Sequence, residues 1–185
     1  MTGERSERAT VLVVDDESSL ADLYAHWLSD RYDVRTAYGG KEALETMDDD
    51  VDVILLDRRM PDMSGDDVLE RLRARNYDVR VAMVTAVDPD FDVLDMECDD
   101  YLVKSVTKED LVKTVEKLLR LAEYDEKRRE LSSKRVRHNV LQVEKTETEL
   151  DTSDAYQRLK VEIEELEAEL GELGDVLDND AETYL

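Results

Sequence analysis

Short apolar runs alternate with amphipathic stretches between residue 10 and about residue 122, and this alternation constrains the fold more than any other feature. Continuous apolar runs of this length are typical of strands that are buried on both faces of a sheet. The runs lie at 11–14, 34–37, 53–56, 81–84 and 101–103, and helical periodicity occupies 18–29, 41–47, 65–75 and 107–122. Alternating strands and helices predict an α/β fold with a doubly wound parallel sheet of five strands.

The region that follows predicts helix only, since it has no proline and no glycine before Gly171. Apolar residues recur there at spacings of three and four, which is a heptad seam: Tyr156, Leu159, Ile163, Leu166, Leu170, Leu173 and Leu177. A weaker stripe lies upstream at Val136, Val140, Val143 and Leu150. We expect a two-helix antiparallel hairpin or coiled-coil module, with a turn at 150–154 and Thr152 or Ser153 as the N-cap of its second helix.

These patterns divide the chain into an N-terminal tail (1–9), an α/β domain (10–122), a helical domain (123–178) and a C-terminal tail (179–185).

The formal net charge of −24 opposes general binding to nucleic acid or to anionic membranes. Carboxylates spread along a whole chain suit a cytoplasm with molar salt, so we hypothesise a halophilic source. A single cysteine, Cys98, excludes an intrachain disulfide, and no apolar run is long enough to cross a bilayer. The sequence predicts a cytoplasmic protein without a membrane partner.

Polar residues follow the predicted strands where each strand ends. Asp15, Asp16, Asp57, Thr85 and Lys104 occupy these positions, and the carboxyl ends of parallel strands share one edge of the sheet. Carboxylates held close together repel one another, and Mg²⁺ prefers a few carboxylates plus water. A carboxylate can attack phosphorus, and a lysine and a metal ion can neutralise the charge of a transferring phosphoryl group. The site therefore predicts Mg²⁺-dependent phosphoryl chemistry.

This arrangement resembles the receiver domain of two-component response regulators. The matching segments are VLVVDDE at 11–17, ILLDRRMPDMSG at 54–65, VTA at 84–86 and DDYLVKS at 99–105. The resemblance covers residues 10 to about 122 and implies the flavodoxin-like form of the doubly wound sheet. It also implies a phosphoacceptor that is the substrate of a kinase rather than a turnover enzyme. A small enzyme similar to an acyl-phosphatase is the weaker alternative.

The resemblance implies a role for each residue of the site. Asp57 is the phosphoryl acceptor, and a sensor histidine kinase is the donor. Asp16, Asp57 and the backbone carbonyl of Arg59 would ligate Mg²⁺ directly, and Asp15 would act on the ion mainly through a bound water. Lys104 pairs with the phosphoryl group, while Thr85 and Tyr101 form a switch that responds to it.

Three departures from the receiver pattern change what we expect of Lys104, of the segment before the fifth strand and of the fourth helix. Ser105 stands where the family has a proline after the lysine, so the geometry of Lys104 is in question. Glu97 and Cys98 replace a common Gly-Ala pair before the fifth strand. The stretch from Thr85 to Tyr101 is short, which predicts a shortened or irregular fourth helix.

The helical region resembles the HalX domain, a module attached to receivers in haloarchaea. Its segment 127–137 carries six Lys or Arg residues against one Glu. This basic island could contact DNA or a partner through Lys134, Arg135 and Arg137, or it could form ion pairs with the acidic second helix. Two outputs therefore stay open, a transcriptional regulator or a phosphorylation-switched docking adaptor without DNA binding. A homodimeric coiled coil is an alternative to the intramolecular hairpin.

Overall fold

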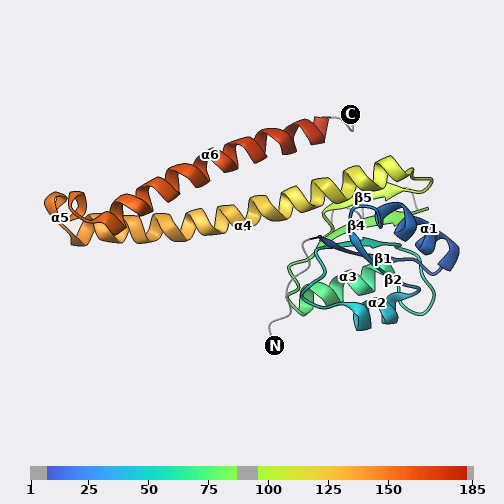
Figure 1. Ribbon diagram of the computed structural model, residues 1–185. Helices are drawn as coiled ribbons and strands as arrows, with labels where there is room; N and C mark the ends of the chain where they lie inside the picture. The colour runs from blue at the N-terminus through green and yellow to red at the C-terminus, as the bar shows by residue number, and fades with distance from the viewer. Residues whose placement is uncertain (1–7, 87–95, 183–185) are drawn as a thin grey trace. The chain divides into compact units, whose positions relative to one another are not determined.

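The five apolar runs form the five strands of one parallel sheet (Figure 1). The computed structural model describes residues 8–86 and 96–182. The chain divides into two units, Met1–Leu119 and Arg120–Leu185, and the division falls within a helix. The first unit contains β1 (Thr10–Val14), α1 (Ser18–Leu28), β2 (Asp33–Ala37), α2 (Gly40–Thr46), β3 (Val53–Leu56), α3 (Gly65–Ala74), β4 (Arg80–Thr85), β5 (Asp100–Val103) and the beginning of α4 (Lys108–Glu144).

The strand order is β2-β1-β3-β4-β5, and every neighbouring pair is parallel. This order confirms the predicted doubly wound sheet. The expected fourth helix of this unit, between Thr85 and Tyr101, falls largely on residues 87–95, which lie outside the described residues.

Two apolar layers cover the sheet because side chains alternate along each strand. Leu12 and Ile54 belong to the layer that α2 and α3 complete, while Val13 and Leu55 belong to the layer completed by α1 and by the first part of α4. All residues of β1 and β3 are buried, which accounts for their continuous apolar sequences. Each fully buried aliphatic side chain contributes roughly 1.5–3 kcal/mol.

The second unit is a helical hairpin formed by the rest of α4, the short α5 (Glu147–Asp151) and α6 (Asp154–Glu182) (Figure 1). The predicted seam is the least exposed side of α6, with Tyr156 and Leu166 buried. Ser153 accepts a hydrogen bond from the backbone N–H of Tyr156, so it is the expected N-cap. The predicted turn starts inside α5, whose Thr146–Glu149 capping box adds a helical turn.

The three valines of the weaker upstream stripe do not pack in this hairpin, whereas its last residue, Leu150, is half-buried. Val136, Val140 and Val143 have exposed fractions of 60%, 54% and 83%. The less exposed side of α4 in this unit instead carries Leu131 and Leu141, together with partly buried polar side chains. None of the described helices is long and apolar enough to cross a membrane.

Candidate functional site

Three carboxylates meet at the carboxyl edge of the sheet. Asp15 and Asp16 follow β1, and Asp57 follows β3, the strand beside it. One carboxylate oxygen from each lies within 4.8 Å of the others. Asp15 and Asp57 are buried, whereas Asp16 is exposed. The ladder of the sheet extends into the site, because the N–H of Asp57 donates to the carbonyl of Val14 at 2.9 Å.

Lys104, directly after β5, places its amine among these carboxylates. Its Nζ lies 2.6 Å from Asp15 Oδ2 and 3.2 Å from Asp57 Oδ2. The N–H of Lys104 donates to the carbonyl of Thr85 at 2.8 Å, which fixes the end of β5 against β4. The sequence predicted that these groups share one edge of the sheet, and the structure adds that the lysine contacts two of the carboxylates directly. The Lys104–Ser105 peptide bond is cis.

Burial and the neighbouring charges have opposite effects on the pKa values of Asp15 and Lys104. Burial raises the pKa of Asp15, although the hydrogen bonds from Lys104 and from the N–H of Glu17 act against this rise. Burial also disfavours the charged amine of Lys104, yet its hydrogen bond to Asp15 and the negative charge of Asp57 raise the pKa of Lys104 overall. The lysine therefore stays charged at neutral pH and partly compensates two buried carboxylates.

The loop from β3 to α3 holds the predicted acceptor by backbone contacts. The N–H of Arg59 donates to Asp57 Oδ1 at 3.3 Å. The N–H of Gly65 donates to the carbonyl of Arg58 at 2.8 Å. A Cβ at Gly65 would lie 2.3 Å from the carbonyl oxygen of Asp57, so only glycine fits here. Ser64 and Asp67 form a capping box that starts α3 immediately after this loop.

The two predicted switch residues lie on the neighbouring strands. Thr85 is fully buried at the end of β4 and is paired in register with Val103 of β5. Tyr101 is half-buried, faces Met83 in register and packs against the layer covered by α2 and α3. Lys104 directly follows β5, so both residues lie on the two strands at that end of the sheet. Their response to a phosphoryl group stays a prediction.

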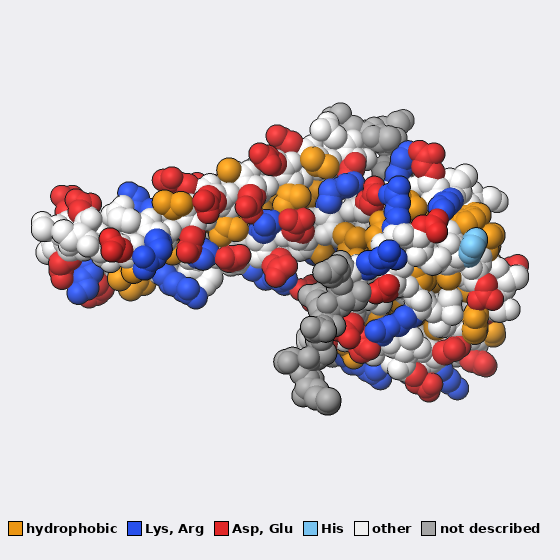
Figure 2. All heavy atoms as spheres, in the orientation of Figure 1, with side chains coloured by type: hydrophobic (Ala, Val, Ile, Leu, Met, Phe, Trp, Pro, Cys, Tyr) orange, Lys and Arg blue, Asp and Glu red, His pale blue; other side chains and the backbone are white. Residues whose placement is uncertain are grey.

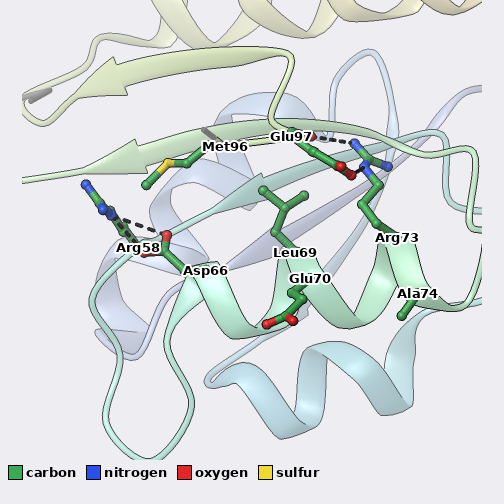
Figure 3. A pocket seen from close by; sticks show the side chains of 8 residues that line it. All are labelled: Arg58, Asp66, Leu69, Glu70, Arg73, Ala74, Met96 and Glu97. Carbon is green, nitrogen blue, oxygen red and sulfur yellow. Dashed lines mark hydrogen bonds and ion pairs between the residues drawn. The ribbon is translucent and has the colours of Figure 1, made fainter. Parts of the chain in front are cut away.

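A separate hollow of about 640 Å³ lies beside α3 (Figure 3). Leu69, Ala74 and Met96 supply apolar surface there. Its two arginines are already engaged, Arg58 with Asp66 and Arg73 with Glu97. Both cationic groups of the hollow are thus held by carboxylates of the hollow itself, and the carboxylate cluster at the sheet edge is the stronger candidate site.

The basic island of the hairpin is partly neutralised by α6. Lys134 Nζ lies 2.6 Å from Glu162, Arg135 lies 2.7 Å from Glu167, and Lys127 lies 2.6 Å from Glu169. The hydrogen bond to Glu162 raises the pKa of Lys134. Among the candidate contact residues, Arg137 makes no ion pair within 4.0 Å in the part of the chain that the structure describes. The sequence left the choice between a binding surface and internal pairs open because it does not show which residues of α4 and α6 meet.

Two family models match the chain. The response regulator receiver domain matches residues 11–116, and the HalX domain matches residues 120–184. A protein of Haloferax volcanii named "Putative transcriptional regulator" is 48% identical over 152 residues, which cover 82% of this chain and 25% of that protein. Response regulator SaeR of Staphylococcus epidermidis is 32% identical over 113 residues, covering 59% of this chain and 49% of SaeR. The chain thus spans a quarter to half the length of these relatives.

Solved receiver structures share the fold. A CheY-like receiver domain protein of Methanospirillum hungatei superposes with a TM-score of 0.60 at 25% identity, covering 64% of this chain and 99% of that one. Response regulator TrrA of Thermotoga maritima, solved in complex with Mg²⁺-BeF, gives a TM-score of 0.53 at 32% identity, covering 60% and 99%. The carboxylate cluster, the strand order and both family matches indicate the same family. The chain belongs to the two-component response regulators, with a receiver domain followed by a HalX domain.

Proposed function

We propose that Asp57 accepts a phosphoryl group from a phosphohistidine of a sensor histidine kinase, and that this modification switches the output of the HalX hairpin. The observation that carries the proposal is the position of Asp57, a buried carboxylate 3.2 Å from the Lys104 amine and next to two further carboxylates. Such a carboxylate is oriented and partly charge-compensated before any substrate arrives, which favours its use as a nucleophile.

The donor set fits a magnesium ion. Three carboxylates within 4.8 Å of one another face a single lysine charge, so negative charge remains in excess at this edge. We infer that Asp15, Asp16, Asp57 and the carbonyl of Arg59 would hold Mg²⁺ there. When bound, the ion would offset the negative charge of the phosphoryl oxygens.

The residues of the chain then have distinct tasks. An Asp57 oxygen attacks phosphorus and forms the acyl-phosphate bond, while the bond from phosphorus to the histidine nitrogen breaks and its electron pair leaves with the imidazole. Lys104, which holds Asp57 before the reaction, would move its charge to a phosphoryl oxygen. The Thr85 hydroxyl would donate a hydrogen bond to another phosphoryl oxygen, and Tyr101 would rotate in response. Hydrolysis of the acyl phosphate at the same site would return the switch to its resting state.

Mg²⁺ should stabilise the folded chain through this cluster. Folding raises the pKa of Asp15, so keeping this carboxylate ionised at neutral pH lowers the free energy of unfolding. This loss of stability disappears as the pH falls through the raised pKa of the folded chain and then below the ordinary pKa of an aspartate. A ligand at about ten times its Kd adds roughly 1.4 kcal/mol, or about 5 °C in the midpoint of a domain of this size. We expect Asp15→Asn to raise the midpoint without Mg²⁺ and to remove the response to Mg²⁺.

The measurement is thermal unfolding of both proteins in molar KCl at neutral pH, with and without MgCl₂. Asp62→Asn is the matched control, since Asp62 is exposed in the neighbouring loop and should keep the full Mg²⁺ response. A midpoint that falls in Asp15→Asn would mean that the ion pair with Lys104 outweighs the burial of Asp15. An unchanged Mg²⁺ response would place the ion elsewhere.

For the output, we propose transcriptional regulation, as the name of the Haloferax volcanii relative suggests. Genome-wide chromatin occupancy of the tagged protein in its native host, beside Asp57→Ala, tests this output. We expect discrete peaks that depend on Asp57 and are lost in Arg137→Glu, because Arg137 is the candidate contact residue without an ion pair to α6 among the described residues. No peaks in any strain would instead support the docking adaptor.

A further inference from the structure

One side of α4 in the hairpin carries an apolar stripe that nothing covers among the described residues. Val136, Val140 and Val143 follow one another at spacings of four and three, so they lie on the same side of the helix. Their exposed fractions of 60%, 54% and 83% contrast with Leu131 of the packed side, which is buried. We name these three residues the valine stripe. Such spacing is typical of a helix that pairs with another helix.

The valine stripe lies in the longest segment of the chain without a carboxylate. Residues 131–143 contain no Asp or Glu, although the chain has 49 of them. Neutral polar side chains flank the valines, among them the exposed Ser132 and Asn139. In Figure 2 the edge of the hairpin formed by α4 shows an apolar patch with basic side chains beside it. Two copies of a chain with a net charge of −24 repel each other, and this segment removes carboxylates from the surface that would meet.

The charges that flank the valine stripe differ between its two halves. Arg129 and Arg137 flank its N-terminal half, and Glu144 and Glu147 follow its C-terminal end, all four with exposed side chains. Lys145, between the two glutamates, lies 3.4 Å from Glu149. A parallel pair of stripes would place like charges together. An antiparallel pair would place the arginines of one copy near the glutamates of the other, on both sides of a two-fold axis. The charge pattern therefore favours a second copy in the antiparallel direction.

We propose that the valine stripe pairs with the valine stripe of a second copy, antiparallel, about a two-fold axis near Val140. Duplex DNA fits the three valines themselves less well than a second copy does, because they are apolar and the glutamates beyond them would repel phosphates. With the axis near Val140 and α4 ending at Glu144, the two helices overlap over residues 136–144, which is about 14 Å at 1.5 Å per residue. This is short for the ~800 Å² that each partner contributes to a stable complex, so the dimer should be weak and dependent on concentration. The pairing does not require phosphorylation of Asp57.

Sedimentation equilibrium of the unphosphorylated full chain in molar KCl tests the proposal. We expect a reversible monomer–dimer equilibrium whose dissociation constant rises at least tenfold in Val140→Glu. The matched control is Val161→Glu, since Val161 is an exposed valine on α6 with a comparable exposed fraction of 52%. It should leave the dissociation constant within about twofold. Far-UV circular dichroism would verify that both variants keep their helices.

A charge exchange tests the antiparallel direction of the pair. Arg137→Glu and Glu144→Arg should each weaken the dimer, and the double variant should restore it, because the exchanged charges meet again only across an antiparallel pair of copies. The proposal is wrong if the wild-type chain stays monomeric at the highest accessible concentration, or if Val140→Glu and Val161→Glu behave alike. It is also wrong if Val140→Glu leaves the mass unchanged but loses retention of a random-sequence DNA duplex, which would mark a nucleic-acid surface.

Discussion

Asp57→Asn is expected to abolish Mg²⁺-dependent labelling of the chain by acetyl phosphate. The amide cannot form an acyl phosphate, and it removes one of the three carboxylates that face a potential metal ion. We expect the rate of labelling to fall below detection, which corresponds to a loss of at least a thousandfold, or about 4 kcal/mol in the activation free energy. Mass spectrometry of the intact protein after incubation with acetyl phosphate and MgCl₂ measures the effect.

The fold should tolerate this substitution. In the wild-type chain Lys104 contacts both Asp15 and Asp57, and the loss of one carboxylate leaves the amine paired with the other at 2.6 Å. Asn also keeps an oxygen that can accept the hydrogen bond from the N–H of Arg59. The unfolding midpoint of Asp57→Asn should therefore equal or exceed that of the wild type when Mg²⁺ is absent, so loss of labelling would not reflect unfolding.

Asp62→Asn is the control for the labelling experiment. Asp62 is exposed in the same loop and has a φ of 65°, a backbone conformation that asparagine also tolerates. Labelling should stay at the wild-type rate in this variant. Labelling that persists in Asp57→Asn would show that another carboxylate is the acceptor.

Gly65→Ala should destabilise the receiver unit by about 3 kcal/mol, near the upper end of the usual cost of overpacking. The added Cβ would lie 2.3 Å from the carbonyl oxygen of Asp57 and 2.9 Å from Cα of Arg58. Both are backbone atoms, so the contact can be relieved only if the loop that holds the acceptor moves. A shift of Asp57 away from Lys104 should also slow labelling by acetyl phosphate at least tenfold. Denaturant unfolding followed by circular dichroism and the labelling assay measure the two effects.

The same substitution at Gly171 should act in the opposite direction. Gly171 lies inside α6, and apart from the adjacent residues and backbone of this helix, no atom of the described residues lies within 4 Å of the position where its Cβ would be. Alanine in a helix interior is favoured over glycine by about 0.5–1 kcal/mol, so Gly171→Ala should stabilise the hairpin and leave labelling unchanged. If both alanine variants lost stability equally, the close approach at Gly65 would not explain its effect.

Some features of this protein were accessible from the sequence because they depend on local pattern and on general topology. Continuous apolar runs identified β1, β3 and β4, and a parallel sheet brings the ends of its strands to one edge in any arrangement of the helices. This is why residues as distant as Asp15 and Lys104 could be assigned to one site. The heptad seam of α6 was also predictable from the sequence, because its apolar residues recur with the period of a packed helix side. Two of them, Tyr156 and Leu166, are buried.

Other features depend on which distant residues meet, and local pattern carries no information on this. The side of α4 that packs in the hairpin includes the polar side chains of Lys134 and His138. The apolar side chains of Val136, Val140 and Val143 remain exposed. Lys134 is accommodated there because Glu162 of α6 lies 2.6 Å from its amine, and His138 because its ring stacks on Tyr156. A period in the sequence gives the side of a helix that is apolar, but not the partner that covers it.

The sequence by itself thus determined the parallel sheet, the carboxylate edge with its lysine and the helical nature of the C-terminal region. Only the tertiary structure decided that Lys104 contacts Asp15 as well as Asp57, that Gly65 lies against the acceptor backbone and that half of the basic island is paired with α6. The physical reason is the separation along the chain of the residues that determine each feature. Strand and helix patterns arise from neighbours along the chain, whereas ion pairs and close backbone approaches form between elements whose separation is set only when the whole chain packs.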